Sequence, residues 1–318
     1  MVEDVLFEPS VSNTVNLNSL ATDMLVLQER RILEICEIAA NFVDLVRELG
    51  DDEMSLCEIF SLLSGGELLP SHSPDDDSVM PSNLPRINSY LKLLSASDRA
   101  VFASFVRERL LQAGIGISEN DFLSTAKSEH TFVYVKNAFS DEAYDVFSQE
   151  FSNPRVSYLN SFKDALAAVS DGRVSYCLLP IEERGARIST VDEMIFKSDL
   201  KVVSITPVWG FDGLADMKYA LVSRHFVESA IAADDDRYFE FRLPKDFSER
   251  LGDILSAAES FRFEIYRLNT VRFDTDDGER DYFSIVLRSS GTDFVEMLIY
   301  LTLFADEFNA VGLYKNIE

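Results

Sequence analysis

Charged residues follow directly after the most apolar segment of the chain, within residues 176–194. The sequence YCLLPIEERGARISTVDEM indicates a buried strand that breaks at Pro180 and leads into Glu182, Glu183 and Arg184. Two neighbouring carboxylates can divide acid and base roles when their surroundings push their pKa values apart, and an arginine can hold a carboxylate through its planar fork. The segment predicts either a ligand site at the carboxyl end of a strand or a solvated turn, and a turn is the more common use of such residues.

Other cations near this segment also have two possible uses. Lys218, at the beginning of a later strand, can clamp a substrate carboxylate or lie on the surface as a strand-end lysine. Arg184 and Arg187 can bind an anion or form ion pairs with the acidic surface of the chain, and we favour the ion pairs.

The sequence offers few residues that could bind a metal or a cofactor. The histidines and cysteines are scattered and show no CxxC spacing: His72, His130, His225, Cys36, Cys57 and Cys177. Zinc sites and histidine-based triads need several such groups together, so the sequence predicts neither a metal nor a cofactor. Cysteines in apolar surroundings indicate reduced thiols and a cytoplasmic protein.

The bulk composition excludes several classes of partner. The chain has 318 residues, of which 47% are hydrophobic and 26% charged, and its formal net charge is −26. These values are typical of a folded protein of two or three domains, and the acidity argues against nucleic acid and anionic membranes. The amino terminus lacks the basic and apolar regions of a secretory signal. The apolar stretch 294–305 is too short to span a bilayer.

A helical module is predicted for the first part of the chain. Residues 1–18 are expected to be flexible, and residues 19–124 carry helical periodicity, beginning with one long helix. A mobile loop is predicted over residues 64–86, which are rich in serine, proline and aspartate. A later helix is expected to be capped by Ser97 and closed by Gly114.

Two further segments contain the strands, so the predicted fold class is α/β plus α+β. Residues 131–226 alternate strand and helix, which predicts a single, doubly wound parallel α/β lobe. Residues 237–318 have the order βαββαβ, which is that of a ferredoxin-like unit. Phenylalanines alternate along the strands of this unit and are predicted to lie in its core: Phe239, Phe241, Phe261 and Phe263.

The segment SFKDALAAVSDGRVSYCLLPIEERGARISTVDEM resembles the first lobe of prephenate dehydratase. The matching residues occur in the order of that family: Phe162, Gly172, Pro180, Ile181, Glu182, Gly185, Thr190 and Asp192. The earlier segment KNAFSDEA is similar to the family's Gly-Thr-Phe-Ser-x-x-Ala, with Phe139, Ser140 and Ala143 retained. The resemblance implies that Phe139, Ser140, Glu183 and Arg184 lie at a ligand site.

The carboxyl-terminal unit, which ends in VGLYKNIE, is similar to the ACT domain of these enzymes. The resemblance implies a regulatory domain that binds a small aromatic or carboxylate ligand and pairs into a homodimer. Lys245, Asp246, Asn269 and Thr270 stand where the family holds phenylalanine. The helical module resembles, in layout only, the chorismate mutase that precedes the dehydratase in bifunctional relatives.

Departures from the family pattern fall on its catalytic parts. The family's Thr-Arg-Phe signature corresponds to Met217, Lys218 and Tyr219, and about a dozen residues replace a whole second lobe. With Glu182, the residues Lys218 and Tyr219 are the degenerate catalytic positions that the resemblance implies. A methionine cannot protonate a leaving hydroxyl, and a lysine lacks the bidentate fork of arginine.

Three functions remain open on the sequence. The favoured one is a degenerate prephenate-dehydratase-like protein of phenylalanine biosynthesis that acts as a ligand-sensing or regulatory module. The alternative is an active dehydratase, with or without mutase activity, whose site is completed in an oligomer. The third is a structural subunit that binds another protein through the helical module.

Overall fold

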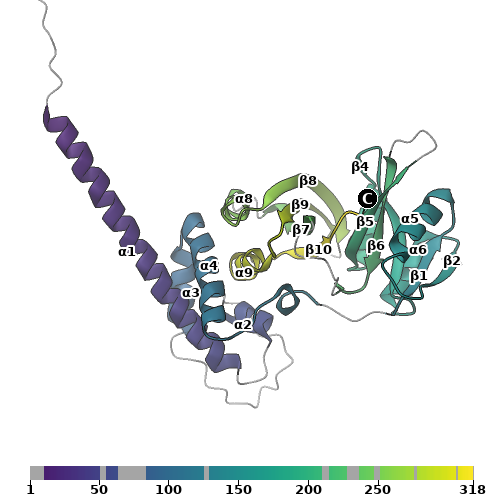
Figure 1. The fold of residues 1–318 in the computed structure, drawn as a ribbon, viewed down its shortest axis with the longest axis horizontal. Coiled ribbons are helices and arrows are strands. Elements are labelled where there is room, and N and C mark those ends of the chain that lie inside the picture. The colour runs from purple at the N-terminus through teal and green to yellow at the C-terminus, as the bar shows by residue number, and fades with distance from the viewer. Residues whose placement is uncertain are drawn as a thin grey trace, which may run out of the picture.

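The computed structural model arranges the chain as a helical module, a ferredoxin-like unit and an α/β lobe in a row (Figure 1). It describes residues 11–50, 55–63, 84–124, 129–209, 215–227, 236–246, 251–275, 278–305 and 307–317. None of the helices in these ranges is both long and apolar enough to cross a membrane.

The helical module comprises α1 (Val11–Gly50), α2 (Leu56–Leu63), α3 (Leu84–Leu93) and α4 (Ala96–Gln112). α1 begins eight residues earlier than predicted, inside the segment expected to be flexible. The predicted loop over 64–86 overlaps α3 at its end, and its residues 64–83 lie outside the described residues. The cap of α4 is Ser95 rather than Ser97, because the Ser95 side chain accepts a hydrogen bond from the Asp98 amide. Gly114 ends this segment with a φ of 78°.

The α/β lobe contains β1 (Thr131–Val135), α5 (Ala138–Ser148), β2 (Arg155–Leu159), α6 (Phe162–Ser170), β3 (Tyr176–Glu183), β4 (Ala186–Arg187), α7 (Ser189–Lys197), β5 (Lys201–Trp209) and β6 (Ala215–Ser223). Its sheet order is β2-β1-β3-β6-β5. β1, β2 and β3 are parallel, as predicted, whereas β6 is antiparallel to both of its neighbours. Five residues, 210–214, join β5 to β6. So short a connection has no room for a second lobe.

β3 does not break at Pro180 as the sequence indicated, but continues to Glu183. Pro180 lies beyond the residues of β3 that pair with β1, and the pairing with β6 shifts register between Pro180 and Glu182. Proline is tolerated in a sheet at such an irregularity, where its missing N–H removes no ladder bond. Arg184 and Gly185 then turn the chain into β4, with φ of 48° and 78°. Two positive φ values are typical of a two-residue hairpin turn.

The ferredoxin-like unit contains β7 (Asp236–Pro244), α8 (Leu251–Ser260), β8 (Glu264–Thr275), β9 (Gly278–Ser290), α9 (Val295–Phe304) and β10 (Asn309–Tyr314). Its strands are antiparallel in the order β10-β7-β9-β8, which confirms the predicted topology. β10 also pairs in parallel with β5, where Gly312 is opposite Val202. The two units therefore share one ten-stranded sheet.

α9 is apolar on all sides because it is covered on all sides. Every α9 residue except Glu296 and Thr302 is buried, and one hydrophobic core extends from α1, α2 and α4 through α8 and α9 to the sheet. The four phenylalanines of the predicted core are all buried there. The helical module thus covers the helical face of the ferredoxin-like unit.

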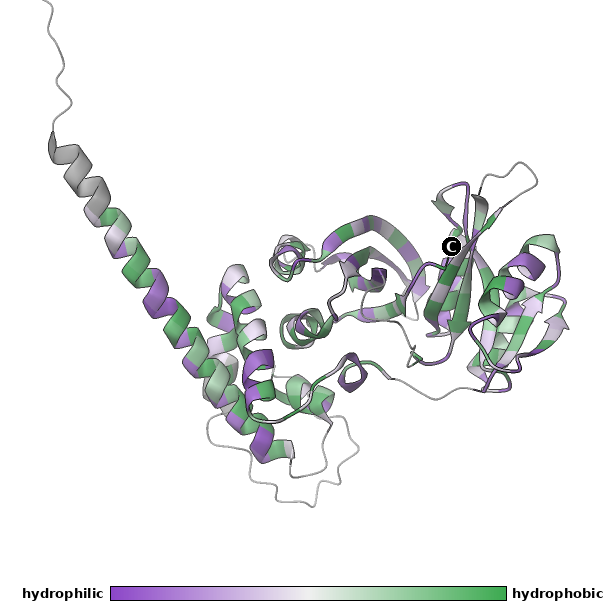
Figure 2. Cartoon of the chain, viewed as in Figure 1, coloured by the Kyte–Doolittle hydropathy of each residue, from purple (hydrophilic) through white to green (hydrophobic). Residues whose placement is uncertain are grey.

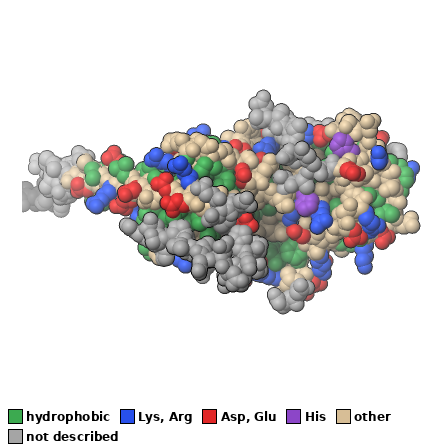
Figure 3. All heavy atoms as spheres, turned by 90° about the horizontal axis from the view of Figure 1, so that it is seen from below, with side chains coloured by type: hydrophobic (Ala, Val, Ile, Leu, Met, Phe, Trp, Pro, Cys, Tyr) green, Lys and Arg blue, Asp and Glu red, His purple; other side chains and the backbone are tan. Residues whose placement is uncertain are grey.

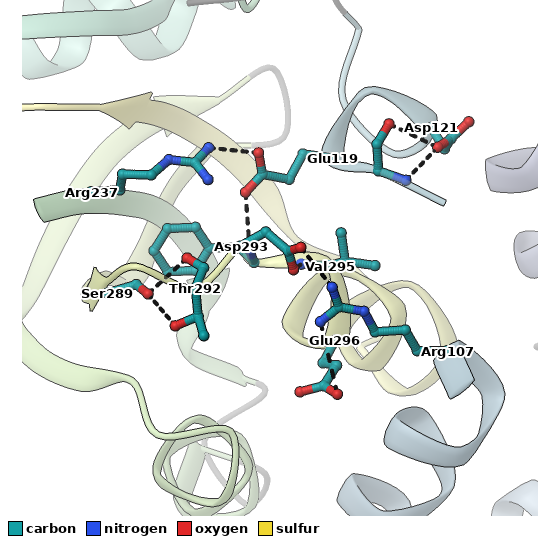
Figure 4. Close-up of polar contacts among 11 residues, drawn as sticks. Arg107, Glu119, Asp121, Arg237, Ser289, Thr292, Asp293, Val295 and Glu296 are labelled. Atoms are coloured by element: carbon teal, nitrogen blue, oxygen red, sulfur yellow. Dashed lines mark hydrogen bonds and ion pairs between the residues drawn. The ribbon is translucent and has the colours of Figure 1, made fainter. Parts of the chain in front are cut away.

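Polar contacts at the start of α9 fix the helical module on this unit (Figure 4). Glu119 accepts a hydrogen bond from the Phe294 amide at 2.9 Å and one from Arg237 at 2.5 Å. On the α4 side, Arg107 donates to Asp293 at 2.6 Å. A carboxylate that accepts the free N–H groups at a helix amino terminus stabilises that helix, so Glu119 ties the module and α9 together.

Candidate functional site

The two faces of β7 have different chemistry and meet different parts of the molecule. In the sequence YFEFRL, Phe239 and Phe241 belong to the core shared with α8 and α9, whereas Tyr238 belongs to the core of the lobe. Because side chains alternate along a strand, Glu240 and Arg242 point to the lobe side with Tyr238. Both are 1% exposed, so two charged residues are buried where the lobe meets the ferredoxin-like unit.

Glu182, at the end of β3, forms the first ionic bridge across this junction. Its Oε2 accepts a hydrogen bond from Arg267 Nη2 at 2.8 Å, and its Oε1 lies 3.2 Å from Lys218 Nζ. Lys218 belongs to β6 of the lobe, whereas Arg267 belongs to β8 of the ferredoxin-like unit. The Glu182 side chain is 7% exposed. Glu182 is therefore a buried partner of two cations, and the solvated turn begins one residue later at the exposed Glu183.

Arg187 forms a second bridge directly beside the first. It follows the hairpin turn in β4, where it is opposite Glu182, and donates to Glu240 of β7. The hydroxyl group of Tyr314 donates to the other oxygen of Glu240 at 3.2 Å. Arg187 Nε also lies 3.4 Å from Asp192. The preference for ion pairing at Arg187 is confirmed, although the pair is buried rather than on the surface.

Arg242 completes this group of charges under unusual conditions. Its Nη2 lies 3.2 Å from Asp192 Oδ1, but none of its three guanidinium nitrogens has a hydrogen-bond partner in the described structure. The guanidinium instead lies 4.7 Å from the centre of the Phe273 ring and 5.6 Å from that of Phe196. Attraction to aromatic faces offsets part of the cost of its burial. The junction network therefore consists of Arg187, Asp192, Glu240, Arg242 and Tyr314.

Glu182 and Glu240 each have a pKa below the ordinary value, because the effect of the neighbouring cations outweighs the effect of burial. Burial raises the pKa of Glu182, but Arg267 and Lys218 together lower it by more than burial raises it. The pKa of Glu182 therefore lies below its ordinary value. For Glu240, burial likewise raises the pKa, and Arg187 and Arg242 bring it below the ordinary value. Burial and the neighbouring Glu240 raise the pKa of Tyr314. None of these groups is prepared to exchange a proton near neutral pH.

The Glu182 bridge should contribute less to stability as the pH falls. A carboxyl whose folded pKa is depressed stabilises the folded state above its unfolded pKa of about 4.3, and this contribution is lost as the pH falls through the folded value. We expect E182Q to lower the urea midpoint of unfolding at pH 7 and to differ less from the natural chain below about pH 4. An equal difference at both pH values would contradict this account, and the comparison of two chains cancels the titration of other carboxyls.

The other predicted residues near the lobe do not join this bridge. Ser140 is buried, and it completes a capping box with Asn137 at the start of α5. Phe139 packs against the hydrophobic core that α5 shares with the sheet of the lobe. Tyr219 is 1% exposed and belongs to that core, opposite the Lys218 side. Burial raises the pKa of Tyr219, and its hydrogen bond with Asn137 opposes this effect. Tyr219 therefore adjoins the α5 start, whereas Lys218 adjoins Glu182.

The predicted ligand residues of the ferredoxin-like unit lie at a separate place. Lys245 and Asp246 follow β7 and are exposed, as are Asn269 and Thr270 on β8. Pro244 of β7 and Val271 of β8 both pair with Tyr282 of β9. β9 therefore lies between the end of β7, which Lys245 and Asp246 follow, and β8, which carries Asn269 and Thr270. β8 ends the order of the described strands, so no described strand pairs with its outer edge. Lys245 pairs with Asp281, and Asp246 with Arg280.

Sequence reasoning missed Arg267, Asp192, Glu240 and Arg242. Glu240 and Arg242 alternate with phenylalanine, which is the pattern of a strand with one exposed face, so the local sequence contained no signal that these two side chains are buried. Within the described residues, no cluster of three or more histidine, cysteine, aspartate or glutamate side chains is suited to a metal ion. The ion pairs of the junction hold the two units together. Its carboxylates Glu182, Asp192 and Glu240 are each paired with an arginine.

Comparison with known proteins finds only distant likeness. No family model matches the chain, and no curated protein matches it in sequence. Among solved structures, prephenate dehydratase from Streptococcus mutans is 12% identical with a TM-score of 0.47, covering 59% of this chain and 99% of that one. Prephenate dehydratase from Arthrobacter aurescens in complex with L-Phe is 12% identical with a TM-score of 0.44, covering 58% and 90%.

The quorum-quenching acylase GqqA is 17% identical with a TM-score of 0.43, covering 59% of this chain and 95% of that one. All three values describe a distant structural likeness and do not establish an activity.

Proposed function

We propose that this chain is a non-catalytic, ligand-responsive protein with a prephenate-dehydratase-like fold, which serves phenylalanine biosynthesis as a regulatory module. The observation that carries the proposal is the bridge of Glu182 with Lys218 and Arg267. Two of the three degenerate catalytic positions are there bound to each other and to the ferredoxin-like unit. A lysine neutralised by a buried carboxylate is not free to hold a substrate carboxylate.

Two further features support the loss of the dehydratase reaction. Tyr219 is buried in the lobe core, and the five residues between β5 and β6 leave no second wall to close over a substrate. Dehydration of prephenate requires an acid for the departing hydroxyl and exclusion of water, which together supply several powers of ten in rate. Asn269 and Thr270 are exposed and can contact a small ligand, whereas Lys245 and Asp246 are exposed but form ion pairs with Asp281 and Arg280.

We expect the purified protein to form no phenylpyruvate from prephenate or chorismate above the uncatalysed background. We also expect L-phenylalanine to raise its melting temperature, because a ligand that binds only the folded state stabilises it. T270V should abolish this shift, whereas T190V, a matched change at another exposed threonine, should preserve it. Turnover that K218M removes would overturn the proposal and establish an active dehydratase. A protein that neither reacts nor responds to phenylalanine or prephenate would also overturn it.

A further inference from the structure

The first half of α1 extends away from the rest of the molecule (Figure 1), and its described part alternates between hydrophobic and hydrophilic residues (Figure 2). Among the α1 side chains that the structure describes, the first buried one is Ile35. Before it, seven large apolar side chains are exposed: Leu20, Met24, Leu25, Val26, Leu27, Ile32 and Leu33. Figure 3 shows hydrophobic and charged side chains interspersed along this helix. Such a concentration of exposed apolar groups marks an interaction surface.

One row of these side chains continues the buried face of the same helix. Leu20, Met24 and Leu27 are spaced by four and three residues, and Arg31 and Ile35 follow at intervals of four. Such spacing places residues on one side of a helix and is that of helix–helix pairing. We call Leu20, Met24 and Leu27 the free stripe. The module buries this side of α1 from Ile35 onward, so the free stripe continues the same packing surface but has no partner among the described residues.

A hollow lies on the same side of α1 as the free stripe, closer to the folded module. Its volume is about 520 Å³, and Ile38, Tyr90 and Leu93 are among its lining residues, between α1 and α3. Ile38 follows Leu20 by eighteen residues, which is about five helical turns. The two side chains therefore point in the same direction, and a helix on the free stripe would run towards this hollow.

We infer that the free stripe pairs with the α1 helix of a second copy of this chain, in antiparallel orientation. When Met24 faces Leu27 of the second copy, the reverse contact forms by two-fold symmetry. Asp23 and Arg30, which flank the stripe, then lie opposite each other in both directions. Two ion pairs thus border the apolar contact, and such flanking charges select partner and orientation in paired helices.

The position of Arg31 decides between the two orientations. A parallel pair would bring Arg31 of each copy together within the stripe, with like charges in contact. The antiparallel pair places Arg31 against Leu20 of the second copy, where its aliphatic stem can cover the leucine. Its guanidinium keeps the Asp98 partner that it has within the chain, at 3.3 Å. The antiparallel arrangement therefore satisfies both ends of this side chain.

The two-copy arrangement also agrees with the charge and shape of the molecule. Each copy carries a formal net charge of −26, so two copies repel each other when they approach closely. An antiparallel pair at the free ends of α1 holds the two folded bodies at opposite ends of the contact. The helical face of the ferredoxin-like unit cannot serve this purpose, because α4 and α2 of the same chain cover it.

The 318-residue chain should sediment as a dimer at about 50 µM, well above a micromolar dissociation constant. L27E should convert it to a monomer, because the substitution buries an unpaired charge in the pair. L33E is the matched control, since Leu33 is as exposed as Leu27 and lies on the far side of the helix; it should remain a dimer. Circular dichroism confirms that both variants stay helical. A monomeric natural chain, including one that instead binds liposomes or another protein, would overturn the inference, as would a dimeric L27E.

A charge exchange tests the orientation separately. D23R alone should weaken dimerisation at least tenfold at low salt, since it sets like charges opposite each other in both directions, and R30D alone should do the same. The double variant D23R/R30D should recover a dissociation constant within a factor of about three of the natural one, because both pairs are restored with reversed sign. Failure of the double variant to recover would overturn the antiparallel register.

Discussion

R187A is expected to lower the free energy of unfolding by about 3–5 kcal/mol, the usual cost of removing one partner from a buried ion pair. Arg187 is the hydrogen-bond donor to Glu240 and lies 3.4 Å from Asp192. Without it, Glu240 keeps the Tyr314 hydroxyl but loses the cation that donates to it, and the Asp192 carboxylate keeps Arg242 as its one ion-pair partner among the described residues. Urea unfolding at pH 7, followed by circular dichroism, measures the loss.

Two further variants distinguish the cost of leaving a buried charge unpaired from the cost of removing an arginine at any position. R173A removes an arginine that pairs with Asp171 at the surface, where both side chains are more than 60% exposed; it should change stability by less than about 1 kcal/mol. R187M/E240L replaces both charges by apolar side chains and should be more stable than R187A, because no unpaired charge remains between the substituted positions. Equal losses in R187A and R173A would show that the junction network does not hold the two units together.

G312A is expected to destabilise the chain by about 1–3 kcal/mol through overpacking. A Cβ atom at Gly312 would lie 2.9 Å from the backbone oxygen of Val202 and 2.8 Å from the Tyr314 ring. Real Cβ atoms do not approach a backbone oxygen so closely, and β5 cannot yield without disturbing its pairing with β6. The alanine should therefore push β10 away from β5 at the only register pair that the described strands form there.

Hydrogen exchange locates the effect of G312A within the sheet. Amides of β5 and β10 should lose protection, whereas those of β1 and β2, at the far end of the sheet order, should not. The matched control is G116A, because a Cβ atom at Gly116 meets nothing within 4 Å; it should change stability by less than about 0.5 kcal/mol. Uniform loss of protection in G312A would mean that the two units unfold as one.

Local sequence patterns were sufficient to predict most of the secondary structure. The alternation of strand and helix over residues 131–226 predicted a parallel lobe, and the order βαββαβ predicted the ferredoxin-like unit. Both predictions rest on periodicity and turn residues, which act over a few positions. The strand through Pro180 was predicted wrongly, because the tolerance of a proline depends on neighbouring strands that the local sequence does not reveal.

The junction network could not be predicted from the sequence for a related reason. Arg187 and Glu240 are 53 positions apart and meet only because β10 joins the two units. No spacing rule connects them, and the carboxylate–cation pairing of Glu182 with Arg267 spans 85 positions. The resemblance to prephenate dehydratase assigned Glu182 and Lys218 to catalysis, and that role stays a prediction. In the structure the two form an ion pair within the lobe, and Arg267 connects Glu182 to the ferredoxin-like unit. Whether ligands bind at Asn269 and Thr270 stays a prediction.

The place of β10 has a consequence for how the protein is made. β10 is the last strand in the sequence, yet it lies in the middle of the sheet between β5 and β7. Before β10 has been synthesised, the edges of β5 and β7 with which it later pairs are unpaired, and strands of other nascent chains can add to them. Until β10 emerges, the growing chain contains two separate folding units, which join into one sheet only when β10 pairs with both of them.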